Sequence, residues 1–183
     1  MVSINQINLL IKNPQNKLIM KIKFLLVLAV VAISFSVQSQ DYNNAIGLRA
    51  AWGWALTGKH FLNEKNALEA IVNYRSYGAG AYDYSYFSLT GLFQKHYDIA
   101  SVDGLRWYWG FGARLGSWGG DWDLVDGGDG SFFVGACGNL GLDYKFKNVP
   151  INLSADWIPT FNFVGWGDGF TGEGGGFAIR YAF

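Results

Sequence analysis

Bulky apolar residues alternate with small or polar ones along several stretches of this chain. The alternation has a period of two, which is typical of β-strands because successive side chains of a strand point to opposite faces. It is strictest in residues 105–116, 132–145, 151–163 and 177–183. In the first of these stretches, one face carries Leu105, Trp107, Trp109, Phe111, Ala113 and Leu115, and the other carries Arg106, Tyr108, Gly110, Gly112, Arg114 and Gly116.

Weaker alternation predicts four further strands in residues 45–51, 55–62, 67–77 and 84–97, which brings the number to eight. The first hairpin requires Trp52-Gly53-Trp54 to be a tight connection; without it seven strands would remain, and bacterial membrane barrels have even numbers. The connections alternate in length, as periplasmic turns and extracellular loops do. The short ones are residues 63–66, 98–104 and 147–150, and the long ones are residues 76–83, 117–130 and 165–174.

Composition favours a membrane barrel over a water-soluble domain. Aromatic residues make up 17% of the chain and there are 25 glycines, whereas charged residues make up only 15%. Soluble domains carry charge on about a quarter of their residues. In a bilayer every backbone N–H and C=O group needs an internal partner, so strands that span it must close into a barrel. The predicted fold is therefore an all-β, eight-stranded antiparallel up-and-down transmembrane barrel.

The width of such a barrel decides which face points inward. Eight strands enclose a space that side chains alone can fill, so the small and polar face is expected inside and the bulky face against lipid. The side chains expected to face lipid are Trp107, Trp109, Phe111, Trp157, Phe161 and Phe163. An ion-pair network is expected in the lumen, with an excess of cations that needs neutral acceptors, from Arg49, Lys59, Glu69, Arg75, Arg106, Arg114, Asp143, Asp156 and Arg180.

The opposite orientation of the strands is the main structural alternative. A register with the aromatic residues inside would expose Arg106, Arg114 and Asp156 to solvent, which is physically acceptable. The protein would then be a soluble, secreted barrel that carries a small ligand. If the aromatic stripe faces outward, as predicted, a soluble protein would carry a large exposed apolar patch in water. The soluble alternative therefore requires the opposite orientation.

The N-terminal part of the chain is predicted to be a targeting segment. Residues 20–39 combine a positive start at Lys21 and Lys23, an apolar stretch, and small residues before Gln40, as a cleaved signal peptide does. The apolar stretch is shorter than the roughly 20 residues that span a bilayer. We therefore expect an upstream extension in residues 1–19 with Met20 as the true start, a signal peptide in residues 20–39, and the barrel in residues 40–183.

Removing this segment changes the charge of the chain. The first 40 residues hold four lysines and no acid, so the remainder carries ten basic and fourteen acidic side chains, a net charge near −4. A mildly acidic mature protein argues against a nucleic acid as partner.

The signal peptide, the eight-strand pattern and the terminal Phe183 resemble small outer-membrane barrels of the OmpA/OmpX kind. Residues 46–49, 56–69 and 180–183 resemble the variants found in Bacteroidetes-type bacteria. This resemblance implies the outer membrane of a Gram-negative bacterium, contact with its lipid and lipopolysaccharide, and a monomer with a structural or surface-interaction role. It also implies that Tyr181 and Phe183 form the signal read by the outer-membrane assembly machinery.

Catalysis is not predicted, although some barrels of this size are lipid A-modifying enzymes that use His with Ser and an acid. The two histidines, His60 and His96, fall near the short turns, whereas the serines of the long-loop side lie at the opposite end of the strands. These serines are Ser85, Ser88, Ser117 and Ser131. No catalytic residue and no cofactor is therefore assigned, and a lipid A-modifying enzyme stays as the alternative function.

An acidic loop and one cysteine complete the candidate chemistry. Asp121, Asp123, Asp126 and Asp129 could gather around Ca²⁺ or bridge to lipopolysaccharide through divalent cations. The spacing departs from the EF-hand pattern and its twelfth position is Phe132 rather than Glu, so no metal site is assigned. Cys137 is the single cysteine and is expected to pack as a small residue inside a strand.

Overall fold

A computed structural model describes residues 42–79, 82–120, 132–165, 169–172 and 174–183. The predicted upstream extension, the signal peptide and the acidic loop Asp121–Asp129 lie outside these residues. Within them, no helix is long and apolar enough to cross a membrane.

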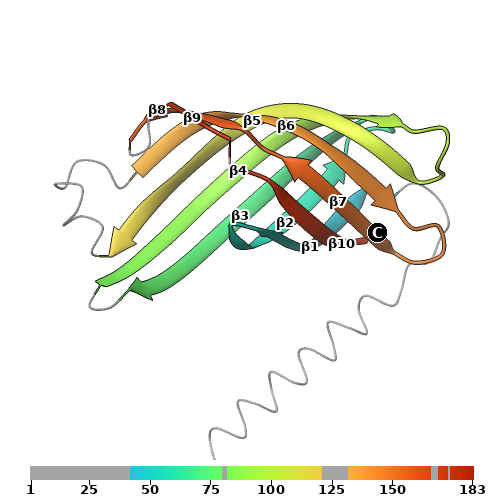
Figure 1. Cartoon of the computed structure of the whole chain (residues 1–183). Coiled ribbons are helices and arrows are strands. Elements are labelled where there is room, and N and C mark those ends of the chain that lie inside the picture. Colours follow the sequence, from blue (N-terminus) through green and yellow to red (C-terminus); the bar gives the residue numbers. More distant parts are fainter. Residues whose placement is uncertain (1–41, 80–81, 121–131, 166–168, 173) are drawn as a thin grey trace, which may run out of the picture. The chain divides into compact units, whose positions relative to one another are not determined.

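The described residues form ten strand segments in one closed antiparallel sheet (Figure 1). Consecutive segments from β1 to β6 pair in chain order, and β6 pairs with both β7 and β8. β1 pairs with β10 and closes the barrel. The segments are β1 (Asn44–Ala51), β2 (Gly53–Phe61), β3 (Asn66–Ala79), β4 (Tyr82–Asp98), β5 (Leu105–Gly120), β6 (Phe132–Lys145), β7 (Ile151–Trp157), β8 (Thr160–Val164), β9 (Gly169–Thr171) and β10 (Gly176–Ala182).

Ten segments correspond to eight barrel strands because two strands are interrupted. β7 and β8 both pair with β6, and they are separated only by Ile158 and Pro159. Pro159 has no N–H to donate to a ladder, but its carbonyl accepts from Gly138 N at 2.8 Å and keeps this strand attached to β6. β9 pairs with β8 and β10 pairs with β7, so these two segments form the last strand. The predicted eight-stranded antiparallel up-and-down barrel is confirmed.

The first hairpin is as tight as the sequence predicted. Ala51 pairs with Gly53, which leaves Trp52 alone at the tip. Gly53 has a φ of 118°, a conformation that side chains with a Cβ rarely adopt. Glycine at this position therefore suits the tight turn of the first hairpin.

Strand residues extend into each of the three connections expected to be long loops, which corrects the predicted bounds of these loops within the described residues. β3 continues to Ala79, β4 begins at Tyr82 and β5 continues to Gly120. Backbone pairing needs no apolar alternation, so these Gly-, Ser- and Tyr-rich segments continue the ladder beyond the apolar part of the wall. Residues 169–171, also expected in a loop, form β9.

The strands consequently end at different levels at the end of the barrel that holds the β1–β2 turn and the β3–β4 connection. We call this the outer end. β1 and β2 have 8 and 9 residues, whereas β3, β4 and β5 have 14, 17 and 16. Pairing of β2 with β3 ends at Asn73, so six residues of β3 project further, about 20 Å along the strand. Figure 1 shows β3, β4 and β5 running well past the short β1–β2 hairpin.

Bulky side chains cover the outside of the wall. The six aromatic residues expected to face lipid are between 38% and 60% exposed, whereas Tyr108, between two of them in β5, is fully buried. The reversed register, with these aromatics inside, is therefore not the one observed. We call these outward bulky side chains the apolar belt. Toward the outer end the belt stops at the row Tyr74–Phe87–Ser117–Phe132, because the next outward row is Ser76–Ser85–Gly119.

Candidate functional site

The lumen is the candidate site, and an ion pair between β10 and β3 lies at its centre. The guanidinium of Arg180 contacts the carboxylate of Glu69, and both side chains are fully buried. The other Arg180 nitrogens donate to Thr57 Oγ1 at 3.2 Å, Asn152 Oδ1 at 3.2 Å and Ser154 Oγ at 2.7 Å. Small residues on either side of Arg180 on the inner face of β10, Ala178 and Ala182, leave room for this long side chain.

Lys59 of β2 connects Glu69 to a second carboxylate. Its Nζ lies 3.1 Å from Asp143 Oδ1 and 3.6 Å from Glu69 Oε2, and it sits 4.5 Å from the centre of the Tyr108 ring. Gln94 of β4 donates to Glu69 Oε2 at 2.7 Å and to Asn139 Oδ1 at 2.8 Å. Hydrogen bonds to every ion compensate the desolvation that makes buried charges expensive.

A third ion pair completes the buried network. Arg49 Nη2 of β1 lies 2.5 Å from Asp156 Oδ1 of β7, and the Tyr108 hydroxyl donates to Asp156 Oδ2 at 2.7 Å. Within the described residues, the network thus holds three cations and three carboxylates, whose charges balance. Its charged members are Arg49, Lys59, Glu69, Asp143, Asp156 and Arg180.

The other three cations expected in the network lie elsewhere, which explains why the predicted excess of cations is not found there. Arg106 Nε pairs with Asp98 at 2.8 Å in a partly exposed position near the short turns. Arg114 donates from Nε to Thr90 Oγ1 at 3.1 Å, and Arg75 lies 5.4 Å from the Trp52 ring. Arg106 and Arg114 share the inner face of β5 but are eight positions apart on the strand. The alternation of side chains shows which face a residue is on, but not where it lies along the barrel axis.

Several polar residues of the network were not among those predicted to form it. Gln94, Asn139 and Asn152 are at most 4% exposed and bridge the charged residues. His96 is 1% exposed, stacks on Tyr108 at 4.7 Å and has its Nε2 3.3 Å from Gln94 Oε1. The available signal was that each of them falls on the inward face of a predicted strand. An uncharged polar residue that faces a narrow lumen must also find a hydrogen-bond partner.

The lumen also contains an apolar cluster, in addition to the small and polar side chains expected from the sequence. Ala55, Ile71, Leu92, Cys137 and Ile158 pack together and are at most 5% exposed. Apolar side chains fill space without needing hydrogen-bond partners, so they complement a network whose polar groups are already engaged. The Cys137 Sγ lies 3.4 Å from Thr160 Oγ1 in this packed position.

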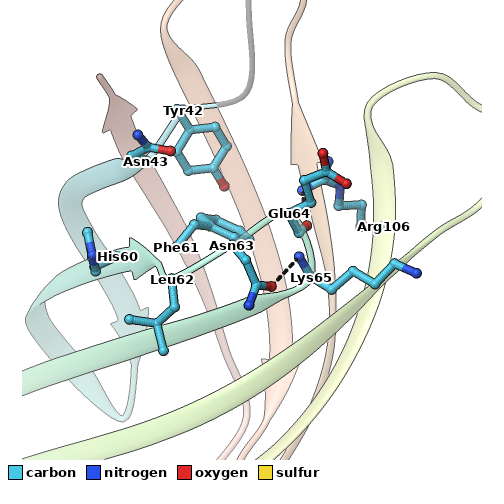
Figure 2. A pocket seen from close by; sticks show the side chains of 9 residues that line it. All are labelled: Tyr42, Asn43, His60, Phe61, Leu62, Asn63, Glu64, Lys65 and Arg106. Atoms are coloured by element: carbon cyan, nitrogen blue, oxygen red, sulfur yellow. Dashed lines mark hydrogen bonds between the residues drawn. The ribbon is translucent and has the colours of Figure 1, made fainter.

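A surface pocket of ≈ 600 Å³ lies at the end of the barrel with the short turns (Figure 2). Tyr42 and Phe61 line it with rings 5.1 Å apart, edge to face, and the Arg106 guanidinium lies 5.9 Å from the Phe61 ring. The Tyr42 hydroxyl donates to Asp143 Oδ2 at 3.2 Å, so this residue separates the pocket from the buried network. Burial and the neighbouring Asp143 carboxylate raise the pKa of Tyr42, which keeps the phenol neutral and able to donate.

A second cavity, of ≈ 270 Å³, occupies the outer half of the lumen. Its lining includes Arg49, Arg114 and Ser88 together with the aromatic residues Tyr86, Trp118 and Phe133. Among the described residues, no group of three His, Cys, Asp or Glu side chains could hold a metal ion. We call this cavity the outer chamber.

Comparison with known proteins adds little beyond the fold. No protein-family model matches the chain. No curated protein matches it either. Among solved structures, the N-terminal β-barrel domain of Pseudomonas aeruginosa OprF is 17% identical, with 79% of this chain and 100% of that domain covered and a TM-score of 0.48. Ail, the attachment invasion locus protein of Yersinia pestis, is 12% identical, with 76% and 93% covered and a TM-score of 0.43.

Proposed function

We propose that this protein is a closed barrel in the outer membrane of a Gram-negative bacterium, with a structural or surface-interaction role rather than that of a channel. The observation that carries the proposal is the combination of an apolar outside with a neutral, buried ion-pair network inside. An apolar belt in contact with water would be unfavourable, whereas the same belt suits hydrocarbon. The backbone pairing of a closed barrel meets the demand that hydrocarbon makes on every N–H and C=O group.

The filled lumen argues against conduction. The buried network joins β1, β2, β3, β6, β7 and β10 across the interior, and the apolar cluster occupies further space. An ion that passed through would have to separate pairs such as Arg180 and Glu69, each of which would then be a buried charge without a partner. A packed interior is also what the diameter of an eight-stranded barrel favours.

The stepped wall supports an orientation with the outer end facing the surroundings of the cell. Short turns at one end and long extensions at the other are typical of periplasmic and extracellular sides. In this orientation the projecting parts of β3, β4 and β5 form the surface available for contact with lipopolysaccharide or with another cell. The belt below the Tyr74–Phe87–Phe132 row contacts outer-membrane lipid.

The closed pairing and the last strand support two further parts of the proposal. β1 pairs with β10 of the same chain, so the barrel needs no second copy to satisfy its edges, and we expect a monomer. Tyr181 and Phe183 have ring centres 6.1 Å apart at the end of the last strand. They are available there to the outer-membrane assembly machinery before the barrel closes.

The geometry does not favour a lipid A-modifying enzyme. His96 packs against Tyr108 and Gln94, and His60 Nδ1 lies 2.8 Å from Asn44 Oδ1. His60 lines the pocket at the end of the barrel with the short turns, and the His96 N–H donates to the Lys65 carbonyl in one of those turns, whereas Ser88 lines the chamber in the other half. A histidine that activates a serine must be within hydrogen-bond reach of it.

Cell fractionation combined with electrophoresis tests the proposed location and fold. We expect the protein in the outer-membrane fraction, with a different mobility in unboiled and boiled samples because the closed barrel resists detergent. In planar bilayers the purified protein should add no stepwise conductance above that of the bare lipid. A protein in the soluble fraction, or sustained channel openings, would contradict the proposal.

A further inference from the structure

The outer chamber has features of a ligand site that the structural role does not use. It lies in the outer half of the lumen, and its wall includes two members of the apolar cluster, Ala55 and Ile71. Trp52, at the tip of the low β1–β2 hairpin, also lines it and is 64% exposed. The chamber therefore opens toward the low side of the stepped rim, where a molecule from outside could enter.

Arg114 gives the chamber a positive charge, and Arg49, whose charge is balanced by Asp156, adds a second guanidinium to its lining. Arg114 donates to the hydroxyl of Thr90, and within the described residues it has no carboxylate partner. Arg49 is 2% exposed; its Nη2 is engaged with Asp156, but its Nη1 has no hydrogen-bond acceptor in the described part of the chain. A buried guanidinium nitrogen without an acceptor is unfavourable, because it has lost water and gained nothing in exchange. An anion in the chamber would supply that acceptor.

The same chamber has an aromatic wall. Tyr86 lies 4.7 Å from Trp118 and stacks nearly parallel to Phe133 at 5.8 Å, all distances between ring centres. Gly116 makes this arrangement possible, because a Cβ at that position would meet the Phe133 ring at 2.5 Å. The rings offer an apolar surface on which a planar group can stack.

We propose that the outer chamber binds a small aromatic monocarboxylate from the surroundings of the cell. The planar guanidinium of an arginine matches a carboxylate, and the aromatic wall matches a ring, so the two halves of the ligand meet two different parts of the chamber. A volume of ≈ 270 Å³ is just below the usual range of about 300–1,000 Å³ for ligand pockets, which restricts the site to a small molecule. Ser88 adds a hydroxyl to the lining. This site goes beyond the proposed structural role and would not depend on it.

Calorimetric titration of the folded barrel in detergent micelles tests the site with three probes. Benzoate carries both the ring and the carboxylate, benzyl alcohol carries the ring without the charge, and inorganic phosphate carries charge without a ring. We expect one saturable benzoate site per barrel, with benzyl alcohol and phosphate at least tenfold weaker. Benzyl alcohol also controls for partition into the micelle.

Two arginine substitutions on one strand locate the site. Arg114→Gln should weaken benzoate binding at least tenfold, because it removes the cation that has no partner carboxylate. Arg106→Gln is the matched control, since this arginine occupies the same face of β5 at the opposite end and should leave the affinity within twofold. Heat-dependent mobility on gels checks that each variant is folded, and the three-probe comparison on the unaltered protein needs no variant at all.

Three outcomes would overturn the proposal. The first is the absence of saturable benzoate binding to the unaltered protein. The second is an equal effect of Arg114→Gln and Arg106→Gln. The third is phosphate binding as tight as that of benzoate, which would indicate a site for anions in general rather than for an aromatic carboxylate.

Discussion

Arg180 of β10 and Glu69 of β3 form a fully buried ion pair, although they lie 111 residues apart in the sequence. Neither strand pairs with the other in the sheet; β1 and β2 lie between them. The pair therefore reaches across the lumen between two strands that are not adjacent in the sheet. It links the closure of the barrel to the packing of its interior.

Loss of one partner of this pair should destabilise the barrel strongly. Glu69→Gln leaves Arg180 and Lys59 facing a neutral amide, and removing one partner of a buried ion pair costs about 3–5 kcal/mol. Urea unfolding in lipid vesicles, followed by tryptophan fluorescence, measures the free energy of unfolding. The matched control is Asp98→Asn, which removes an exposed partner of Arg106 and should cost less than about 1 kcal/mol. Equal losses of unfolding free energy in the two variants would show that the buried pair contributes no more to stability than the exposed one.

An arginine placed on the outside should be tolerated only above the apolar belt. Phe111 is 59% exposed near the middle of the belt, so Phe111→Arg should cost about 2–4 kcal/mol in a bilayer. Ser76, outside the belt in the same barrel wall, should accept an arginine at a cost of about 0–1 kcal/mol. Folding into vesicles at increasing urea compares the two variants, and a smaller loss for Phe111→Arg than for Ser76→Arg would contradict the assignment of the belt.

The tip of the first hairpin should require glycine. Gly53→Ala puts a Cβ on a residue with a φ of 118°, and we expect a loss of more than about 1 kcal/mol. Gly58→Ala, on the same strand, is the control: a Cβ there meets open space and the φ is not positive, so the loss should be small or absent. Unfolding midpoints in urea decide between them. Similar midpoints for both variants would mean that the turn is not strained by a side chain.

The pH response of an exposed ion pair between two short turns can be predicted in sign. Lys147 Nζ lies 2.6 Å from Asp103 Oδ2, and its hydrogen bond and charge lower the pKa of Asp103 below its ordinary value of 3.8. A lowered pKa stabilises the folded state above the ordinary value, and this contribution is lost as the pH falls through the lowered one. Carboxyl NMR titration should show the Asp103 pKa rising toward 3.8 in Lys147→Gln. An unchanged pKa would show that the pair does not persist in solution.

The sequence allowed prediction of the strands and of whether their side chains point inward or outward. It did not allow prediction of where each side chain lies along the barrel axis. Parity assigned Tyr108, Arg106 and Arg114 to the same inner face of β5, yet Tyr108 is buried in the network while the two arginines lie toward opposite ends. Height depends on the register between strands and on the tilt of the barrel, which the pattern of a single strand does not contain. For the same reason, the contact of Arg180 with Glu69 could not be distinguished from other pairings of cations and carboxylates.

The ends of the strands were also beyond prediction. The outward alternation stops near Tyr74 and Leu115, because the next outward residues on these strands are Ser76, Ser117 and Gly119. The backbone ladder continues regardless, through Ser76 and Gly78 of β3 and through Gly119 of β5. A change in the type of outward side chain therefore looked like the end of a strand.

Quenching of tryptophan fluorescence by lipids brominated on their acyl chains tests the central claim most directly. Two variants would each keep one of the eight tryptophans, with the other seven replaced by phenylalanine. One keeps Trp109, which is 43% exposed on the outside of β5, and the other keeps Trp118, which is 9% exposed on its inside. A lipid-facing exterior and a closed interior predict strong quenching of Trp109 and little quenching of Trp118. Quenching of Trp118 equal to or stronger than that of Trp109 would contradict the account.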